Sequence, residues 1–419
     1  MLSDGRSVVL ASTKELKSVP DGARSVRVES THGLLSAGNN LDGLGQRRCH
    51  ERAVQSSGKV TRFGKIIIPI FPNPLGGVIQ LAKQRVLVTG GAGFIGSEVV
   101  RQLAAHGFDV LIVDNLMNGK RENLEAVLAK NVELAVADIR DQKSMTSLFR
   151  GVDIVFHLAC LGVRHSLHSP IENQEVNATA TLGLLAIAMA QEVKRFVYIS
   201  TSEVYGMVHT APIAENHSTL PYTVYGASKL AGEAYTRAFW HTYGYPTVML
   251  RPFNAYGPRC HHEGDSGEVI PRFMLRCLAG RPMVIFGDGT QTRDFTFVSD
   301  TAAGILAAGL SDASVGRTLN LGSGKEIEIQ LLAKMISEVL GRPDAQILYT
   351  DPRPGDVVRL LSDSSKAKEL LNFKTTVKLR DGLARLRDWY ATQGESPEEL
   401  LEREIERNWE VQHVLRNAS

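Results

Sequence analysis

A tyrosine and a lysine stand four residues apart in the segment YGASK, which runs from Tyr225 to Lys229. If this segment is helical, a spacing of four places both side chains on one face, so the ammonium can lie near the phenol. A positive charge there lowers the pKa of Tyr225 and makes the phenolate available as a base. The pair therefore predicts a site that removes the proton of an alcohol.

A second polar group occurs in YISTSEVYG, residues 198–206, between an apolar strand and a turn. Thr201 offers a hydroxyl that can bond to the oxygen of an alcohol. Ser202 is a very weak acid, whereas the carboxylate of Glu203 can transfer a proton. Glu203 could instead only cap the turn or bond to a backbone amide.

The segment VTGGAGFIGSEVV contains Gly90, Gly93 and Gly96, which follow a strand and open a helix. Glycines allow the backbone to approach a pyrophosphate, and the helix amino terminus supplies unpaired N–H groups and a favourable dipole. The next strand ends at Asp114, where a carboxylate can bond to the ribose hydroxyls and repel a 2′-phosphate. This predicts NAD rather than NADP, and Tyr225 would deprotonate an alcohol as hydride leaves for the oxidised nicotinamide.

Short β-branched runs alternate with helix-like segments from Lys83 onward. The expected strands are RVLVTG, DVLIVD, VELAVAD, DIVFHLA, RFVYIS and TVMLRP. Such alternation predicts an α/β fold with a doubly wound parallel (Rossmann) sheet. The expected division is a poorly ordered N-terminal extension over 1–82, a dinucleotide-binding domain over 83–258, a smaller C-terminal α/β substrate-binding lobe mostly over 259–393 and a C-terminal helix over 394–419.

The composition of the 419 residues bounds the possible partners. Lysine and arginine number 47 against 45 aspartate and glutamate, so no global field favours nucleic acid or an anionic membrane. The four cysteines are far apart and the histidines lack metal-ligand spacing, so we expect neither a disulfide framework nor a metal site. We expect no membrane-spanning segment, and a reducing cytoplasm fits best.

Taken together, the motifs resemble those of the extended short-chain dehydrogenase/reductase family, specifically its enzymes acting on nucleotide-activated sugars. The likeness runs from about Arg85 to Trp389 and is carried by TGGAGFIGS, DNL, ADIRD, HLAC, STSEVYG, YGASK, RPFNAYGPR, TRDFTFVSD and PRPGD. The resemblance implies a tightly held NAD, a nucleotide-diphosphate sugar as substrate and a homodimer that pairs through the helices of residues 171–191 and of Tyr225.

The resemblance also implies the residues of the site. The catalytic group would be Thr201, Tyr225 and Lys229, with Glu203 as a further candidate. The cofactor would be held by Gly90, Gly93, Phe94, Ile95, Gly96, Asp114, Asn115, Asp138, Ile139, Leu158, Ala159, Ser200, Tyr225 and Lys229. The sugar nucleotide would be held by Asn254, Arg293, Arg353 and Asp356, since arginines pair with diphosphate oxygens and a carboxylate accepts from a ribose hydroxyl.

The implied first step is oxidation at C4 of the hexose, and three outcomes can follow. A 4-epimerase returns hydride to the other face, a 4,6-dehydratase removes water across C5 and C6, and a uronic acid decarboxylase loses carbon dioxide from the 4-keto acid. Ser202 stands where the dehydratases usually carry an aspartic acid, so we favour the epimerase and keep the other two as alternatives. A non-catalytic NAD-binding regulator is a further alternative, because fold alone does not establish function.

Overall fold

The computed structural model describes residues 84–410 except 129–130, 209, 265 and 354–356. Its centre is a seven-stranded sheet in the order β10-β6-β5-β4-β1-β2-β3, in which all neighbouring strands are parallel. The strands are β1 (Arg85–Thr89), β2 (Asp109–Asp114), β3 (Val132–Val136), β4 (Ile154–His157), β5 (Arg195–Ile199), β6 (Thr247–Pro252) and β10 (Thr318–Leu321). The expected doubly wound parallel sheet is thus confirmed.

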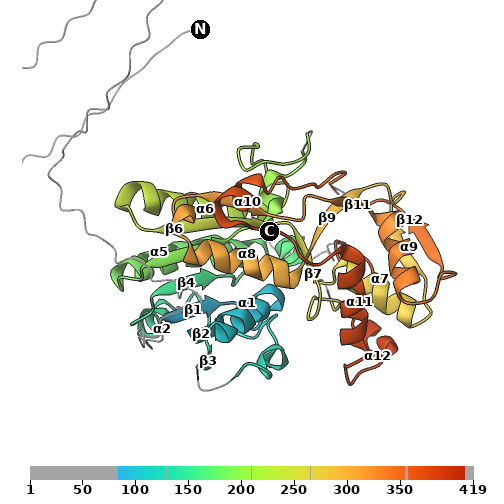
Figure 1. Ribbon diagram of the computed structural model, residues 1–419, viewed down its shortest axis with the longest axis horizontal. Coiled ribbons are helices and arrows are strands. Elements are labelled where there is room, and N and C mark those ends of the chain that lie inside the picture. The colour runs from blue at the N-terminus through green and yellow to red at the C-terminus, as the bar shows by residue number, and fades with distance from the viewer. Residues whose placement is uncertain (1–83, 129–130, 209, 265, 354–356, 411–419) are drawn as a thin grey trace, which may run out of the picture. The chain divides into compact units, whose positions relative to one another are not determined.

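Each face of the sheet is covered by its own set of helices (Figure 1). Successive strand residues point to opposite faces. On β1, Val86 and Val88 therefore join one buried cluster, whereas Leu87 joins another. The first cluster includes side chains of α1 (Phe94–Ala105) and α8 (Val298–Leu310), and the second includes side chains of α2 (Gln142–Leu148), α5 (Ala180–Ala190) and α6 (Val224–Tyr243). Burial on both faces explains why the strands are almost entirely apolar.

The strand order reverses between β1 and β4. The chain runs from β1 to β2 and β3 on one side of this point, and from β4 to β5 and β6 on the other. In open parallel sheets a crevice forms at such a switch point, outside the carboxyl ends of the strands. The fold therefore gathers the ends of β1, β2, β4 and β5 around one place for a ligand.

A smaller lobe follows β6. It contains a three-stranded sheet in the order β11-β9-β7 and a two-stranded sheet of β12 and β8. Its elements are β7 (Asn254–Tyr256), α7 (Val269–Leu278), β8 (Met283–Phe286), β9 (Thr292–Phe297), β11 (Glu326–Glu328), α9 (Ile329–Val339), β12 (Ile347–Thr350), α11 (Leu379–Tyr390) and α12 (Pro397–Leu401). A third buried cluster joins these helices and strands into one core.

Residues 259–393 are divided between the two parts of the fold. Strand β10 pairs with β6 in the central sheet, and α8 packs on α1. Helix α10 (Ser365–Leu371) packs on β10 and α8. The short strand TLNL carries no signal that assigns it to one sheet rather than the other, because pairing is set by distant residues.

The helix expected over residues 394–419 is much shorter than predicted. Helix α12 ends at Leu401, and the following backbone turns to form a bridge between Glu404 and Gly264. Glu404 accepts a hydrogen bond from Arg272 at 2.7 Å, which holds the chain away from a continued helix. The amphipathic pattern of the sequence predicts a longer helix, but this tertiary contact prevents the helix from continuing beyond α12. Residues 411–419, like the extension expected over 1–82, lie outside the described residues.

The remaining elements form short turns around the sheet. They are η1 (Arg121–Leu124), α3 (Val163–His168), α4 (Pro170–Gln174), the π-helix η2 (Glu175–Thr179), η3 (Ser202–Tyr205) and η4 (Asp312–Ser314). The helix expected over residues 171–191 is thus made of α4, η2 and α5. Within the described residues, no helix is both long and apolar enough to span a membrane.

Candidate active site

A cavity of about 780 Å³ lies at the carboxyl ends of the central strands and extends to the smaller lobe. Its walls come from the glycine-rich loop, the ends of β2 to β5, the start of α6 and the elements that follow β6. Every described residue that the sequence predicts for catalysis, cofactor binding or substrate binding contributes to these walls. Asp356 lies outside the described residues.

The glycine-rich loop is packed too closely for side chains. Gly90 has a φ of +69°, and a Cβ at this position would lie 2.6 Å from the backbone nitrogen of Ala159. A Cβ on Gly96 would lie 2.0 Å from the carbonyl oxygen of Gly90. Gly93 caps the amino terminus of α1, which begins with Phe94. The loop therefore brings backbone and a helix amino terminus to the cavity wall, an arrangement suited to a pyrophosphate.

Asp114 ends β2 beside this loop and is held by backbone groups. Its carboxylate accepts hydrogen bonds from the amides of Ala92 and Leu116, both at 2.9 Å. Burial raises the pKa of Asp114, and the two amide hydrogen bonds oppose that rise. The carboxylate is thus oriented at the place where the sequence predicts a ribose.

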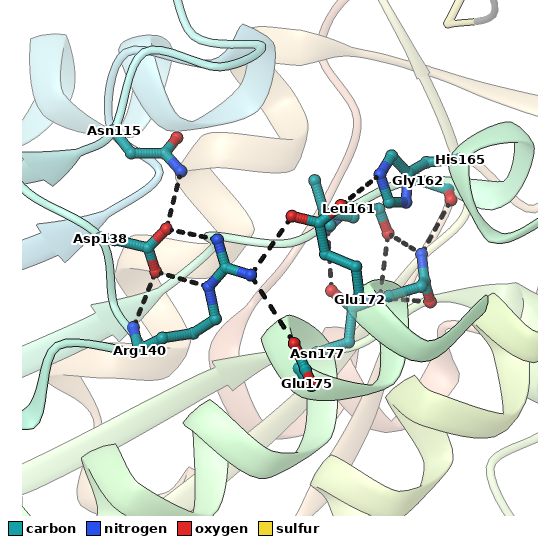
Figure 2. Close-up of polar contacts among 10 residues, drawn as sticks. Asn115, Asp138, Arg140, Leu161, Gly162, His165, Glu172, Glu175 and Asn177 are labelled. Atoms are coloured by element: carbon teal, nitrogen blue, oxygen red, sulfur yellow. Dashed lines mark hydrogen bonds and ion pairs between the residues drawn. The ribbon is translucent and has the colours of Figure 1, made fainter. Parts of the chain in front are cut away.

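Asp138 lies at the same end of the cavity, between Asn115 and Arg140 (Figure 2). The side-chain hydrogen bonds from Arg140 are the largest cause that lowers the pKa of Asp138, to about 2. Arg140 also reaches Glu172 at 3.2 Å and Glu175 at 3.8 Å. Sequence reasoning missed Arg140, although it stands two residues after Asp138. An arginine here could attract a 2′-phosphate, but this guanidinium is already paired with acidic groups.

Tyr225 and Lys229 reach the cavity from the first turns of α6. Thr223 caps this helix by accepting a hydrogen bond from the amide of Gly226 at 3.0 Å. A Cβ on Gly226 would lie 2.8 Å from the carbonyl oxygen of Glu203, so the missing side chain lets α6 approach η3. The predicted helical spacing of Tyr225 and Lys229 therefore holds, and the helix start is fixed against the turn that carries Thr201.

Thr201 hydrogen bonds to the phenol of Tyr225. The ammonium of Lys229 donates to the carbonyl oxygen of Ile199 at 2.5 Å and lies 4.5 Å from the centre of the Tyr198 ring. Burial lowers the pKa of Lys229. The three predicted residues Thr201, Tyr225 and Lys229 are thus brought together at the end of β5.

The protein's own groups raise the pKa of Tyr225, whereas the predicted lowering relies on the charge of Lys229 together with that of an oxidised nicotinamide. Burial raises this pKa well above its ordinary value, and the negative field of nearby groups, including Glu203 and Glu268, adds to the rise. The hydrogen bond from Thr201 opposes it. The lysine turns its ammonium to a backbone carbonyl and an aromatic ring, so helical spacing alone does not lower the tyrosine pKa.

The turn after β5 contains three polar residues, Thr201, Ser202 and Glu203, which have different surroundings. Thr201 is the cap of η3, because its hydroxyl accepts a hydrogen bond from the amide of Glu203 at 3.2 Å. This cap uses the backbone amide of Glu203 and not its carboxylate. Ser202 and Glu203 both contribute to the cavity wall. Ser202 is buried, and Glu203 is close enough to raise the pKa of Tyr225.

The smaller lobe supplies the residues predicted for the substrate. Arg293, on β9, donates to the carbonyl oxygens of Thr292 and Val357 at 2.8 Å and 2.7 Å. Asn254 begins β7, and its buried side-chain oxygen has no hydrogen-bond partner among the described residues. Arg353 lies over the ring of Trp409, with 4.6 Å from its central carbon to the ring centre. Both arginines reach the same cavity as the tyrosine.

Glu268 is an acidic residue of the cavity that sequence reasoning missed. It directly precedes α7 and is half-buried, and the structure gives its carboxylate no hydrogen bond from a described residue. Burial raises its pKa from 4.5 to about 7. No local sequence motif marks Glu268, because its place at the cavity is set by the packing of α7 within the smaller lobe.

This raised pKa predicts a pH-dependent stability. The folded state keeps the proton of Glu268 more firmly than the unfolded chain, so this stabilisation is complete below about pH 4.5 and is lost as the pH rises to about 7. Relative to the wild type, Glu268→Gln should therefore raise the melting temperature more at pH 8 than at pH 5, by about 2 °C. Thermal unfolding at both pH values measures this. Glu125→Gln, at an exposed glutamate, is the control, and an equal difference at both pH values for Glu268→Gln would contradict the prediction.

Comparison with known proteins agrees with this geometry. Residues 86–322 match the model of the NAD dependent epimerase/dehydratase family. A putative UDP-glucose 4-epimerase of Methanocaldococcus jannaschii is 36% identical over 309 residues, which are 73% of this chain and 97% of the relative. The chain belongs to the NAD-dependent epimerase/dehydratase family. Its cofactor is NAD.

Members of the NAD-dependent epimerase/dehydratase family similar to this chain carry out different reactions. A UDP-N-acetyl-α-D-glucosaminuronate decarboxylase of Bacillus cytotoxicus is 35% identical, over 74% of this chain and 98% of the relative. The crystal structure of a UDP-glucose 4-epimerase of Thermotoga maritima with UDP-glucose has a TM-score of 0.71 and 34% identity, covering 74% of this chain and all of that one. The family thus fixes the cofactor and the class of enzyme, while the reaction depends on the residues around the tyrosine.

The residues of this chain fit the NAD of the family. At Gly90 and Gly96 a Cβ would collide with backbone atoms, so only side-chain-free residues let the loop and the amino terminus of α1 form this wall of the cavity. The hydroxyl of Ser200 is buried at the cavity without a partner among the described residues, so it is available to a ligand. No cluster of histidine, cysteine and acidic residues suited to a metal ion is present in the described part of the chain.

Proposed function

We propose that the protein is an NAD-dependent nucleotide-sugar 4-epimerase that acts through a transient 4-keto sugar, with Tyr225 as the base. One observation carries this proposal. Thr201, Tyr225 and Lys229 lie together in one cavity, between the glycine-rich loop and the arginines of the smaller lobe. The Methanocaldococcus jannaschii and Thermotoga maritima relatives, both described as UDP-glucose 4-epimerases, support it.

In the proposed reaction Tyr225 takes the proton of the sugar O4, and Thr201 donates a hydrogen bond to the same oxygen. NAD held beside the sugar would supply the chemistry of taking hydride from C4 and giving hydride back. The positive charge of Lys229 is buried beside the site, where the low dielectric strengthens its electrostatic effect. When hydride returns to the other face of the 4-keto sugar, Tyr225 gives the proton back to O4, so no proton is gained or lost overall.

The cofactor and the substrate would occupy opposite ends of the cavity. Asp114, Asn115 and Asp138 would hold the adenine-side ribose, with Ile139 against the adenine and Leu158, Ala159 and Ser200 beside the nicotinamide half. Arg293 and Arg353 would pair with the diphosphate of the sugar nucleotide, and Asn254 would bond to its polar groups. Asp356 would accept from a ribose hydroxyl.

The residue beside Thr201 supports epimerisation over dehydration. A 4,6-dehydration needs an acid for the leaving hydroxyl, and the buried Ser202 has a hydroxyl of far higher pKa than a carboxylic acid. The second candidates are the 4,6-dehydratase and the UDP-glucuronate decarboxylase. Glu203 on the cavity wall favours the first as a possible C5 base, and the Bacillus cytotoxicus relative favours the second.

Glu203→Gln separates the epimerase from the dehydratase. We expect the variant to keep kcat within about threefold of the wild type, because epimerisation uses Tyr225 alone for proton transfer, whereas loss of a general base costs about 10²-fold or more. Steady-state kinetics with the best nucleotide sugar measures this. Glu98→Gln, at a glutamate outside the cavity, is the control for general damage. A loss of 10²-fold or more would contradict the epimerase assignment.

The reaction itself is tested with a panel of UDP-, GDP- and dTDP-sugars that includes uronates. An unchanged mass with a new sugar configuration by NMR is the expected result. A loss of about 18 mass units would indicate the dehydratase and a loss of about 44 the decarboxylase, which are the nominal masses of water and carbon dioxide. A protein that binds NAD and transforms no sugar of the panel would favour the non-catalytic regulator.

We also propose that two copies pair through the helices around α5 and α6. Exposed apolar side chains on these segments support this, since Leu182 of α5 and Tyr243 of α6 are 39% and 56% exposed. Sedimentation velocity should give the mass of two chains, and a monomer at micromolar concentration would argue against the pairing.

A further inference from the structure

The far end of the cavity, in the smaller lobe, contains an aromatic corner. Phe286, the last residue of β8, and Trp409 meet edge to face, with 4.4 Å between ring centres and an angle of 82°. Arg353 lies over both rings, 4.6 Å from the centre of Trp409 and 5.6 Å from that of Phe286. All three side chains contribute to the cavity wall. This corner combines a flat apolar surface with a cation, a pairing that suits an aromatic anionic ligand.

Trp409 and Glu404 reach the cavity wall from a segment near the end of the described chain. This segment, residues 402–410, follows α12 and is named the C-terminal strap here. It lies beyond residues 86–322, the part that matches the family model. A side chain that reaches the cavity from outside the matched region can add a property that the family membership does not supply.

Ion pairs fasten the C-terminal strap to α7. Glu404 accepts from Arg272 at 2.7 Å and from Arg276 at 3.0 Å, and the side chains of Glu404 and Arg272 are only 6% and 8% exposed. Arg276 also pairs with Glu406 at 2.8 Å. Because removing charges from water is costly unless they are fully paired, such a network holds the strap in one position.

The residue before Trp409 is anchored separately. The buried side chain of Asn408 accepts from Arg164 at 3.2 Å and donates to the carbonyl oxygen of Gly267 at 3.3 Å. Arg164 and Gly267 both contribute to the cavity wall. The backbone that leads to Trp409 is therefore tied to the cavity wall, so the indole is positioned before any ligand enters.

We propose that Trp409 forms a wall of the nucleobase pocket, on which the base of the nucleotide sugar stacks beside Phe286. The inference rests on the proposed function, because it assumes a nucleoside diphosphate in this cavity. The adenine-side ribose has its own place near Asp114, at the end of β2, so the lobe end is left for the second nucleotide. Arg293 and Arg353 lie at this end, where they can take the diphosphate next to the base.

Stacking on an aromatic side chain tolerates different bases, because each base presents a flat π-face. Trp409 would therefore contribute affinity for the nucleotide without selecting among pyrimidines. Its removal should weaken nucleoside diphosphate binding by about 5-fold to about 100-fold, the range found for base stacking on aromatic residues. The chemistry at Tyr225 should be unaffected once the substrate is saturating.

The test is calorimetric titration of UDP, dTDP and GDP into the NAD-saturated full-length protein. For the diphosphate that binds the wild type best, Trp409→Ala should raise Kd by at least about 5-fold, whereas Trp409→Phe should stay within about 3-fold because it keeps a ring. Arg407→Ala is the matched control on the same strap, since Arg407 pairs with Glu410 and is exposed. Its Kd should equal that of the wild type.

The possible results separate this inference from the proposed function. An unchanged Kd for Trp409→Ala would overturn the inference, and a tighter Kd would overturn it as well, because the indole would then obstruct the pocket. A wild type that binds none of the three diphosphates would overturn the proposed function and the inference together. The circular dichroism spectrum and the NAD content of Trp409→Ala should match those of the wild type. If Trp409→Ala does not fold, Trp409→Leu is measured in its place. A Kd of Trp409→Leu equal to that of the wild type would then overturn the inference.

Discussion

Tyr225→Phe is expected to lower kcat by about 10³-fold while the protein keeps its NAD. The substitution removes only the hydroxyl that would take the O4 proton, and general acid–base groups contribute about 10²- to 10⁴-fold to rate. The phenol is bonded to Thr201 rather than to the backbone of a neighbouring element, so its loss leaves the fold intact. Initial rates at saturating nucleotide sugar, with bound NAD quantified after denaturation, measure both parts.

A nearby tyrosine provides the control for this experiment. Tyr222 precedes α6 by two residues, is 65% exposed and does not contribute to the cavity wall. Tyr222→Phe should therefore keep the wild-type rate. A Tyr225→Phe enzyme with more than about a tenth of the wild-type kcat would rule out Tyr225 as the proton acceptor.

The second large effect concerns stability. Glu233, on α6, has a fully buried side chain that accepts two hydrogen bonds from Arg251 of β6, at 2.8 Å and 2.6 Å. Arg251 is 3% exposed and also donates to the hydroxyl of Tyr205. Glu233→Ala should lower the free energy of unfolding by about 3 to 5 kcal/mol, because it leaves the guanidinium buried without its counter-charge. The midpoint of urea unfolding measures the change.

Removing both charges should cost much less than removing one. The double variant Glu233→Leu with Arg251→Met should recover most of the lost stability, since a well-packed apolar pair can replace a buried ion pair. If Glu233→Ala lost less than about 1 kcal/mol, the pair would behave like an exposed one, and the buried contact between α6 and β6 would be disproved. The pair matters for the site because α6 also carries Tyr225 and Lys229.

The parts of the site that local patterns describe could be predicted from the sequence. Gly90 follows one apolar strand, Asp114 ends the next, and both lie at the cavity, because a strand end and a tight turn are encoded by adjacent residues. The spacing of Tyr225 and Lys229 correctly predicted one helix that brings both to the cavity. These features need only the periods of helix and strand and the conformational freedom of glycine.

The parts that depend on distant contacts could not be predicted. Trp409 is placed by ion pairs of the C-terminal strap with α7, and those pairs join residues more than a hundred positions apart. The ammonium of Lys229 is directed by the carbonyl oxygen of Ile199, which no side-chain pattern reveals. The raised pKa values of Tyr225 and Glu268 follow from burial, which is a property of the assembled fold.

The late position of β10 has a consequence for synthesis on the ribosome. Strand β6 is complete at Pro252, whereas its partner β10 begins at Thr318, so 65 residues lie between them. Until β10 emerges, the outer edge of β6 presents unpaired amide and carbonyl groups, the kind of edge that recruits strands from other chains. A nascent chain that stalls within this interval is therefore exposed to aggregation, and completion of β10 ends that exposure.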